Sequence, residues 1–380
     1  MRRAVAEAPI PLLDLARVHR PLAAELAADF ARVLESGQFI LGAEHDAFER
    51  ELAQACGVKH AIGLSSGTSA ISLALLAVGV TPGDEVVVPA FTYFATASAV
   101  TQIGAKPVFA DVEPVRFGLD PVALDRVITP KTRAIVAVHL YGLACDLAPL
   151  RAVSEARNVP IVEDAAQAIG AVDAGAPVGT TTAGATLSFF PTKNLGALGD
   201  AGAFLTERDD VAERVRLLRV HGDAGNYRHV TLGTNARLDS LQSAFLRTKL
   251  RHLEEWTEAR RALAENYRRL LAGVAVRLPA EPRDAQHTYH QFTIRASRRD
   301  LLQRHLADHG IGTRIYYPIT VPLQPVFADL GHEAGDFPMS ELLASEVLSL
   351  PIFPGLTAEE QDRVAASVRE FCGETKGETA

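Results

Sequence analysis

One lysine, Lys193, follows the apolar residues SFF and precedes a series of glycines in the stretch SFFPTKNLGALGDAG, residues 188–202. Such a lysine is either a surface ammonium beside a turn or a buried amine that performs chemistry. A desolvated amine loses its proton more easily and becomes a nucleophile that can join a carbonyl carbon as a Schiff base. The apolar residues before Lys193 and close backbone packing at Gly196, Gly199 and Gly202 could provide that setting.

Three other stretches carry residue types that could surround a ligand. In SSGTSA, residues 65–70, small residues and the Thr68 hydroxyl would let an anion approach a helix N-terminus, although an ordinary capping turn explains the stretch equally well. Tyr93 in FTYFATA could stack on a flat ligand or belong to the core. Asp164 in VEDAAQA follows an apolar run, and a buried carboxylate there would need a cation or several donors. Together with Lys193, these groups match what pyridoxal phosphate requires: a phosphate anchor, a stacking ring, a partner for the ring nitrogen and an amine for the aldehyde.

The elements that must position these residues are short β-rich runs that alternate with helical segments. The runs are HAIGL, EVVVP, KPVFA, RAIVAVHL and VPIVED, followed by ATLSFF and GAFLT. This alternation predicts a mainly parallel sheet covered by helices, in which ligands bind at the carboxyl ends of the strands. A long helical stretch from about residue 238 to 271 then joins a large α/β domain, residues 1–248, to a smaller α+β domain, residues 249–380.

Composition excludes several other classes of protein. The net charge of −8 over 380 residues gives no support for a nucleic-acid or membrane surface, and no apolar run approaches transmembrane length. Three widely spaced cysteines argue against a disulfide framework or a zinc cluster, so we expect a reducing cytoplasm. The glycines at 196, 199 and 202 do not have the G-x-G-x-x-G spacing of a dinucleotide loop, and no H-E-x-x-H occurs.

The chain resembles the DegT/DnrJ/EryC1/StrS family of sugar aminotransferases over nearly its whole length. The resemblance rests, in chain order, on SGQFILGAEHDAFERELA, SSGTSA, EDAAQAIG, SFFPTKNLGALGDAG, GTNARLDSLQSAFLRTKL, GTRIYYP and LSLPIFPGLT. It implies the pyridoxal-phosphate-dependent transferase fold type I, which is the aspartate aminotransferase-like fold. In this fold a large domain with a mainly parallel seven-stranded sheet is followed by a smaller α+β domain.

The resemblance also implies roles for individual residues. Lys193 matches the catalytic lysine that binds the cofactor aldehyde. The matching cofactor-binding residues are Gly67, Thr68 and Ser188 for the phosphate, Tyr93 for the ring face, Asp164 for the ring nitrogen, Gln167 for the ring's phenolic oxygen, and Asn235 for the phosphate of the neighbouring subunit. The expected substrate-binding residues are Tyr227, Arg237, Tyr316 and Tyr317, and no metal site is expected.

The implied reaction moves an amino group from glutamate to a nucleotide-linked keto-sugar in a homodimer with shared active sites. The VHLYG run and two longer stretches, FFPTKNLGALGDAGA and GTNARLDSLQSAFLRTKLRHLEEW, favour C3 of a dTDP-linked 3-keto-6-deoxyhexose, with C4 of a 4-keto sugar as the alternative. A sugar dehydratase of the same family would have histidine in place of Lys193, and a non-catalytic regulator would not need both Lys193 and Asp164. Two positions depart from the family pattern: Ser69 stands where aspartate is frequent, and Pro322 stands where histidine is frequent.

Overall fold

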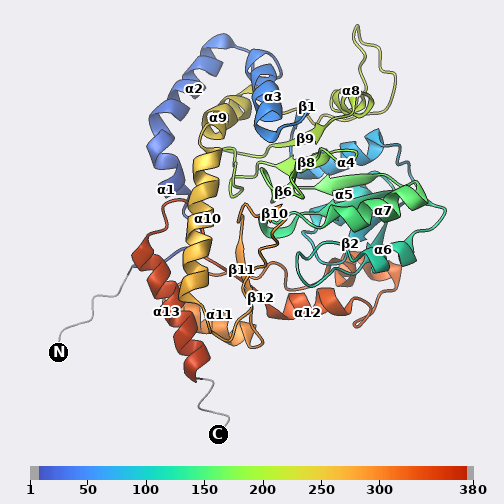
Figure 1. Cartoon of the computed structure of the whole chain (residues 1–380). Coiled ribbons are helices and arrows are strands. Elements are labelled where there is room, and N and C mark those ends of the chain that lie inside the picture. The colour runs from blue at the N-terminus through green and yellow to red at the C-terminus, as the bar shows by residue number, and fades with distance from the viewer. Residues whose placement is uncertain (1–7, 375–380) are drawn as a thin grey trace.

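A seven-stranded sheet forms the centre of the large domain in the computed structural model, which describes residues 8–374 (Figure 1). The strands follow the order β1-β9-β8-β5-β4-β2-β3 across the sheet. Their bounds are β1 His60–Leu64, β2 Glu85–Pro89, β3 Lys106–Ala110, β4 Thr132–Val138, β5 Ile161–Asp164, β8 Ala185–Ser188 and β9 Gly202–Thr206. The seven runs that the sequence indicated as strands are therefore confirmed, as is the number of strands.

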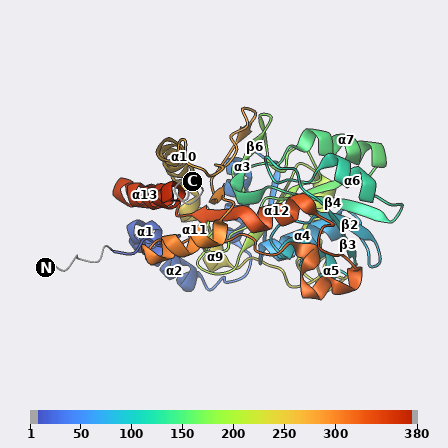
Figure 2. The same ribbon diagram turned by 90° about the horizontal axis from the view of Figure 1, so that it is seen from below.

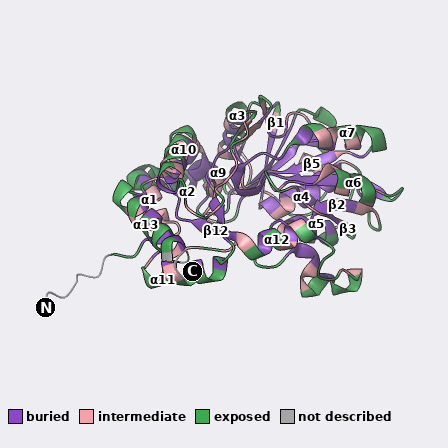
Figure 3. Ribbon diagram, turned by 60° about the horizontal axis from the view of Figure 1, so that its bottom comes forward, coloured by how far each residue is buried: buried purple, intermediate pink, exposed green. Residues whose placement is uncertain are grey.

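The sheet is parallel except at β9, which runs antiparallel to both of its neighbours, β1 and β8. Most residues of these strands are buried, as the purple colour of the sheet in Figure 3 shows. Parallel sheets are covered on both faces, which explains why strands such as EVVVP read as continuous apolar runs rather than alternating ones.

Helices cover both faces of this sheet, with α4 and α5 on one side and α6 and α7 on the other (Figure 2). The first half of the chain supplies α1 Leu15–His19, α2 Ala23–Ser36, α3 Ala43–Cys56, α4 Gly67–Ala77, α5 Ala95–Gln102, α6 Pro121–Val127 and α7 Leu147–Arg157. The helices α8 Asp209–Leu218 and α9 Ser240–Leu250 follow, and short 3₁₀ turns cover Arg20–Leu22 and Leu140–Gly142. The strands β1, β2, β3 and β4 thus each lead through a loop to a helix.

The smaller domain packs helices against a two-stranded antiparallel sheet of β11 and β12. Its elements are α10 Leu253–Leu270, β11 Phe292–Arg295, α11 Arg299–Asp308, α12 Pro338–Glu346, β12 Val347–Leu350 and α13 Ala358–Glu374, with 3₁₀ turns at Val321–Leu323 and Pro325–Leu330. The beginning of the described chain joins the same core, because Ile10 is buried there and pairs with Ile311. No helix in residues 8–374 combines the length and the apolar character that a membrane span needs.

The prediction of one long helix between residues 238 and 271 is wrong, because the segment forms two helices: α9 ends at Leu250 and α10 begins at Leu253. The two helices bury their apolar faces against different partners: α9 packs against α2 and α3, whereas α10 packs against α13. A single straight helix could not satisfy both sets of contacts, so the chain turns at Arg251 and His252.

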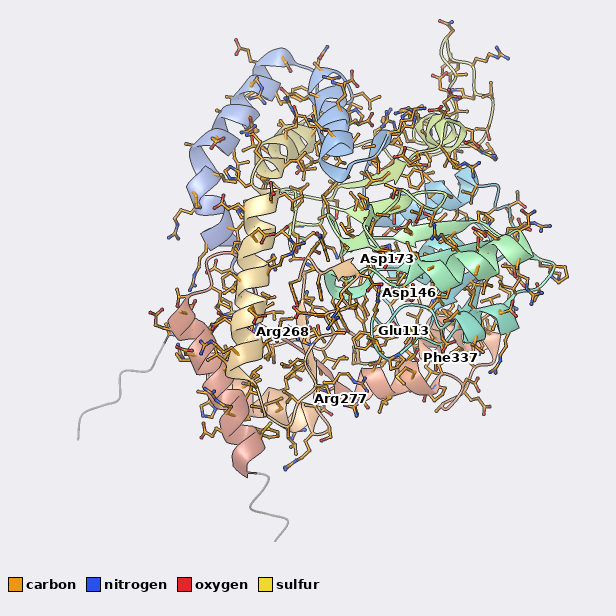
Figure 4. The ribbon with its side chains drawn as sticks, viewed as in Figure 1. Glu113, Asp146, Asp173, Arg268, Arg277 and Phe337 are labelled. Atoms are coloured by element: carbon orange, nitrogen blue, oxygen red, sulfur yellow. The ribbon has the colours of Figure 1, made fainter. Side chains whose placement is uncertain are left out.

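An ion network of buried Arg116 and Asp173 with the more exposed Asp284 ties the chain after residue 280 to the large domain. Arg116 donates to Asp173 and to Asp284, each at 2.7 Å. Asp173 also accepts a hydrogen bond from Leu147 N at the start of α7, close to the capping residue Asp146 (Figure 4). Beside this network the short strands β6 Val172–Asp173, β7 Ala176–Pro177 and β10 Ala285–Gln286 form a three-stranded sheet. This attachment fixes the position of the chain that follows β10, which includes His290 and Gln291.

Candidate active site

A pocket of about 530 Å³ lies at the carboxyl ends of the central strands. Both domains contribute to its wall. From the large domain come Ser66, Gly67, Thr68, Ile71, Thr92, Tyr93, Ala95, Val138, His139, Asp164, Ala166, Gln167, Ser188, Phe190, Thr192, Lys193, Asp200 and Ala201, and from the smaller domain come His290, Gln291, Arg314, Tyr316 and Tyr317. Most of the residues singled out from the sequence therefore meet in one place.

The start of α4 forms one end of this pocket. Ser66 caps the helix by accepting a hydrogen bond from Ser69 N at 3.0 Å, and the Ser69 hydroxyl bonds the hydroxyls of Ser65 and Ser66. Serine at 69 therefore preserves the turn despite departing from the family pattern. A Cβ on Gly67 would lie 2.8 Å from the Ser188 Cβ, so only glycine lets the end of β8 come so close. Free N–H groups and hydroxyls at a helix N-terminus suit a phosphate.

Lys193 lies in the turn after β8, where its backbone N donates to Phe190 O at 2.8 Å. Burial lowers the pKa of the Lys193 amine to about 8, and the nearby negative charge of Asp164 partly opposes this shift. The unprotonated, nucleophilic form of the amine is thus far more populated near neutral pH than it is for a surface lysine. This is the behaviour that the apolar run before the lysine indicated.

Asp164 ends β5 and is 5% exposed. Its two carboxylate oxygens accept hydrogen bonds from Ala166 N at 3.1 Å and from the Thr96 hydroxyl at 2.8 Å. It forms no ion pair with any residue that the structure describes. A buried carboxylate that lines a pocket and lacks an ion-pair partner there matches a ligand that brings a positive charge, such as the protonated ring nitrogen of pyridoxal phosphate.

The neighbouring acid, Glu163, points away from the pocket because successive side chains in a strand alternate. Glu163 is fully buried and accepts hydrogen bonds from His139 Nε2 at 2.8 Å and from Gly179 N at 2.9 Å. The Glu163 carboxylate is therefore hydrogen-bonded within the protein. Of the two consecutive acids, only Asp164 remains available to a ligand.

Aromatic side chains form the opposite wall. The Tyr93 ring is 57% exposed and lies 5.9 Å from the Tyr317 ring, and the Tyr317 hydroxyl accepts a hydrogen bond from Gln167 Nε2 at 3.0 Å. Gln167 also accepts from Tyr141 N at 2.7 Å, and the Tyr141 hydroxyl in turn donates to Tyr316 O. This chain of contacts couples the smaller domain's tyrosines to the end of β5, so a flat ligand would contact both domains.

Three predicted residues do not line this pocket. Asn235 is exposed, and Arg237 is half-buried beside the end of β1, where it pairs with Leu64. Tyr227 is 90% exposed in the loop between α8 and α9, which projects from the body of the molecule in Figure 1. Their predicted roles therefore require a second subunit, and they stay predictions.

Pro322, the other departure from the family pattern, is buried in a 3₁₀ turn and does not line the pocket. Tyr316 and Tyr317, earlier in the same segment, do line it. The departure at Pro322 therefore lies outside the described pocket wall.

Several residues in or beside the pocket were not predicted from the sequence. Thr96 holds Asp164 directly. Asn194, next to the lysine, donates to Thr288 O at 2.9 Å and its Oδ1 lies 3.3 Å from His290 Nδ1, which joins the lysine turn to the smaller domain. Burial and the charge of Lys193 lower the pKa of His290, so its ring is neutral. Arg314 precedes the tyrosines in GTRIYYP and supplies an exposed cation. Thr96, Asn194 and Arg314 each lie in a quoted stretch, and that position was the only signal for them.

The family follows from a comparison with known proteins. The model of the DegT/DnrJ/EryC1/StrS aminotransferase family matches residues 21–369. The chain belongs to this family. The aspartate aminotransferase-like fold expected from the resemblance agrees with the mainly parallel seven-stranded sheet and with the solved relatives.

Two curated relatives and one solved structure show how close this membership is. The erythromycin biosynthesis sensory transduction protein EryC1 of Saccharopolyspora erythraea is 47% identical over 361 residues, covering 95% of this chain and 99% of the relative. The dTDP-3-amino-3,4,6-trideoxy-alpha-D-glucose transaminase of Streptomyces venezuelae is 45% identical over 368 residues, covering 96% and 97%. The structure of S. venezuelae DesV in complex with a ketimine intermediate is 44% identical, with a TM-score of 0.94 and coverage of 96% and 99%.

Proposed function

We propose that this family member uses pyridoxal phosphate to transfer an amino group from glutamate to C3 of a dTDP-linked 3-keto-6-deoxyhexose. The observation that carries the proposal is that a half-buried amine with a lowered pKa, Lys193, and a buried carboxylate without an ion-pair partner in the described residues, Asp164, line one pocket. A dehydratase with histidine at the lysine position does not fit this pair. A non-catalytic regulator would have no use for an amine held at this pKa.

The residues of the pocket fit the cofactor group by group. The start of α4 with Gly67 and Thr68, together with Ser188, would hold the phosphate, and Asp164 would hold the ring nitrogen. Tyr93 would cover one face of the ring, and Gln167, whose side chain already bonds Tyr317, would reach the phenolic oxygen. When bound, pyridoxal phosphate supplies an aldehyde that accepts the amino group and a ring that withdraws electrons from the reacting carbon.

Lys193 would first hold the cofactor and then move protons. A base works best when its pKa is close to the working pH, and burial brings the pKa of this amine to about 8. Asp164 keeps the pKa from falling further, because its negative charge favours the protonated amine. The same amine could therefore remove the proton from the donor's α-carbon in the first half-reaction and deliver a proton to the sugar carbon in the second, with pyridoxal phosphate supplying the other proton-exchanging position in each.

The sugar would enter beside the smaller domain. Tyr316, Tyr317 and the exposed Arg314 line that side, and an arginine suits a diphosphate or a carboxylate. One relative is named as a dTDP-3-amino-3,4,6-trideoxy-alpha-D-glucose transaminase. This name supports C3 as the reacting carbon and dTDP as the nucleotide for this chain. C4 of a nucleotide-linked 4-keto-6-deoxyhexose is the alternative, because rotating the hexose in the pocket changes which carbon reacts.

A homodimer would complete the site. Asn235 would reach the phosphate of the partner's cofactor, and Arg237 and Tyr227 would contact the partner's substrate. Exposure of Tyr227 on a projecting loop supports this arrangement, because apart from an edge contact with the His229 ring the side chain is open to another molecule. The three cysteines are buried and form no disulfide within the described residues, which suits the reducing cytoplasm where we place the reaction.

The test supplies the purified enzyme with pyridoxal phosphate, glutamate and one keto-sugar at a time. A dTDP-3-keto-6-deoxyhexose should give an amino-sugar by mass spectrometry, and the yellow enzyme should bleach on adding glutamate alone. Conversion of only the dTDP-4-keto compound would overturn the C3 assignment and leave the aminotransferase assignment intact. Failure to bleach with glutamate would contradict the choice of donor.

A further inference from the structure

A cluster of metal-ligating side chains lies in the smaller domain, outside the pocket described above. His305 on α11, His309 just after the end of α11, and Glu370 on α13 each present one ligand atom, and these atoms all lie within 4.8 Å of one another. The helices α11 and α13 pack together at the outer end of the molecule (Figures 1 and 3). None of the three residues lines the active-site pocket.

Hydrogen bonds to backbone carbonyls fix the tautomers of both imidazole rings. His305 Nε2 lies 3.1 Å from Ser367 O, and His309 Nδ1 lies 2.8 Å from His305 O. A carbonyl oxygen can only accept, so each of these nitrogens carries a proton. The other nitrogen of each neutral ring therefore keeps a lone pair, which is how metal-binding histidines are usually held.

The geometry is close to that of a transition-metal site. Two imidazoles and a carboxylate are a common ligand set for Zn²⁺, whose bonds of about 2.0–2.2 Å place neighbouring ligands about 3.3 Å apart. His309 and Glu370 are exposed, so small side-chain rotations can close the remaining gap. His305 is held more firmly, because the Phe371 ring packs 5.6 Å from its own.

We propose that His305, His309 and Glu370 form a binding site for Zn²⁺ or a similar divalent transition metal. Three protein ligands come from two helices, and water completes the coordination shell. The ion joins α11 to α13 near the end of α13, whose beginning is already joined to α1 by the Arg17–Glu360 ion pair at 2.7 Å. Both ends of α13 are then held to the rest of the domain, and the role of the ion is structural rather than catalytic.

The test measures Zn²⁺ binding by the chelator-treated full chain, using isothermal titration calorimetry with zinc chloride alone. Wild type should bind one Zn²⁺ per chain. The variants His309→Gln and Glu370→Gln should each bind this ion about tenfold more weakly, or weaker still. Zn²⁺ should raise the thermal unfolding midpoint of wild type more than that of either variant, because only the folded chain holds the three ligands together. Both substitutions are at exposed positions, and circular dichroism checks that each variant is folded.

The matched control is His252→Gln. His252 lies 3.6 Å from Glu255 in an i, i+3 pair, so it offers a histidine and a carboxylate but not a second histidine. This variant should bind Zn²⁺ as wild type does. Equal binding by wild type, His309→Gln and Glu370→Gln, or an absence of binding by wild type, would overturn the proposal. Amino transfer does not enter into any of these measurements, so they are independent of the proposed reaction.

Discussion

Replacing Asp164 by Asn tests whether this carboxylate serves a positively charged ligand. The substitution preserves the shape of the side chain and can keep its contacts: an amide oxygen can still accept from Ala166 N, and the Thr96 hydroxyl can accept from the amide and donate to Thr92. Only the negative charge is lost. Without the cofactor, the variant should be about as stable as wild type, because desolvation of the carboxylate is costly but its charge also favours the protonated Lys193 amine.

With the cofactor the effect should be large. Breaking a buried charge pair costs about 3–5 kcal/mol, and about 1.4 kcal/mol corresponds to a factor of ten in rate. The expected loss in kcat/KM for amino transfer is therefore roughly 10²–10⁴-fold. The assay follows amino-sugar formation at saturating pyridoxal phosphate, so that weaker cofactor binding does not hide the effect.

A second readout concerns Lys193. Burial lowers the pKa of the Lys193 amine to about 8, and the negative charge of Asp164 opposes this shift. Removing that charge should lower the pKa further. In the cofactor-free protein, the pH profile for reductive trapping of an aldehyde on Lys193 should therefore move to lower pH in Asp164→Asn.

The matched control is Asp200→Asn, which removes the other carboxylate of the pocket wall, an exposed one. It should lower kcat/KM far less than Asp164→Asn does. If Asp164→Asn stays within a few-fold of wild type and the trapping profile does not move, Asp164 is only a charge at the end of a strand, and the proposed cofactor geometry is wrong.

Three further changes test other parts of the site. Lys193→Ala should abolish amino transfer while the cofactor still binds through its phosphate and ring, as equilibrium dialysis would show; wild-type turnover would refute the role of the lysine. A Cβ on Gly202 would lie 2.3 Å from the Ser66 carbonyl carbon, so Gly202→Ala should lower the free energy of unfolding by about 1–3 kcal/mol and weaken cofactor binding, whereas Gly199→Ala should be mild in urea titrations. Sedimentation should show a dimer, and Tyr227→Ala should raise the KM for the sugar in it; an active monomer would contradict the shared site.

The fold and the centre of the site could be predicted because their signals are local. Each strand is a short apolar run, Asp164 ends one of them and Lys193 lies in the turn after the neighbouring one, so the topology of a parallel sheet brings them to one edge. The sequence itself thus indicates where these two residues lie. Their separation along the chain does not matter to this argument.

Contacts between distant segments could not be predicted in this way. Thr96 holds Asp164 across 68 residues, and Asn194 reaches Thr288 across 94. Nothing in the local pattern around a threonine in a helix or an asparagine in a turn indicates which carboxylate or carbonyl it will meet. The break between α9 and α10 was missed for the same reason, because it results from packing against other helices and not from a helix-breaking residue.

The glycines after Lys193 show how local chemistry and distant contacts combine. A Cβ on Gly196 would lie 2.3 Å from Pro191 O, so this glycine is needed to close the turn that holds the lysine. Gly202 lies in register between Leu64 of β1 and Ser188 of β8, and it is needed where β9 passes the start of α4. Gly199 would meet only the flexible Gln242 side chain, at 3.3 Å. The glycine series is therefore not one phosphate-binding loop. Gly196 allows the turn that carries Lys193, and Gly202 allows β9 to pass close to the start of α4, where we propose that the phosphate binds.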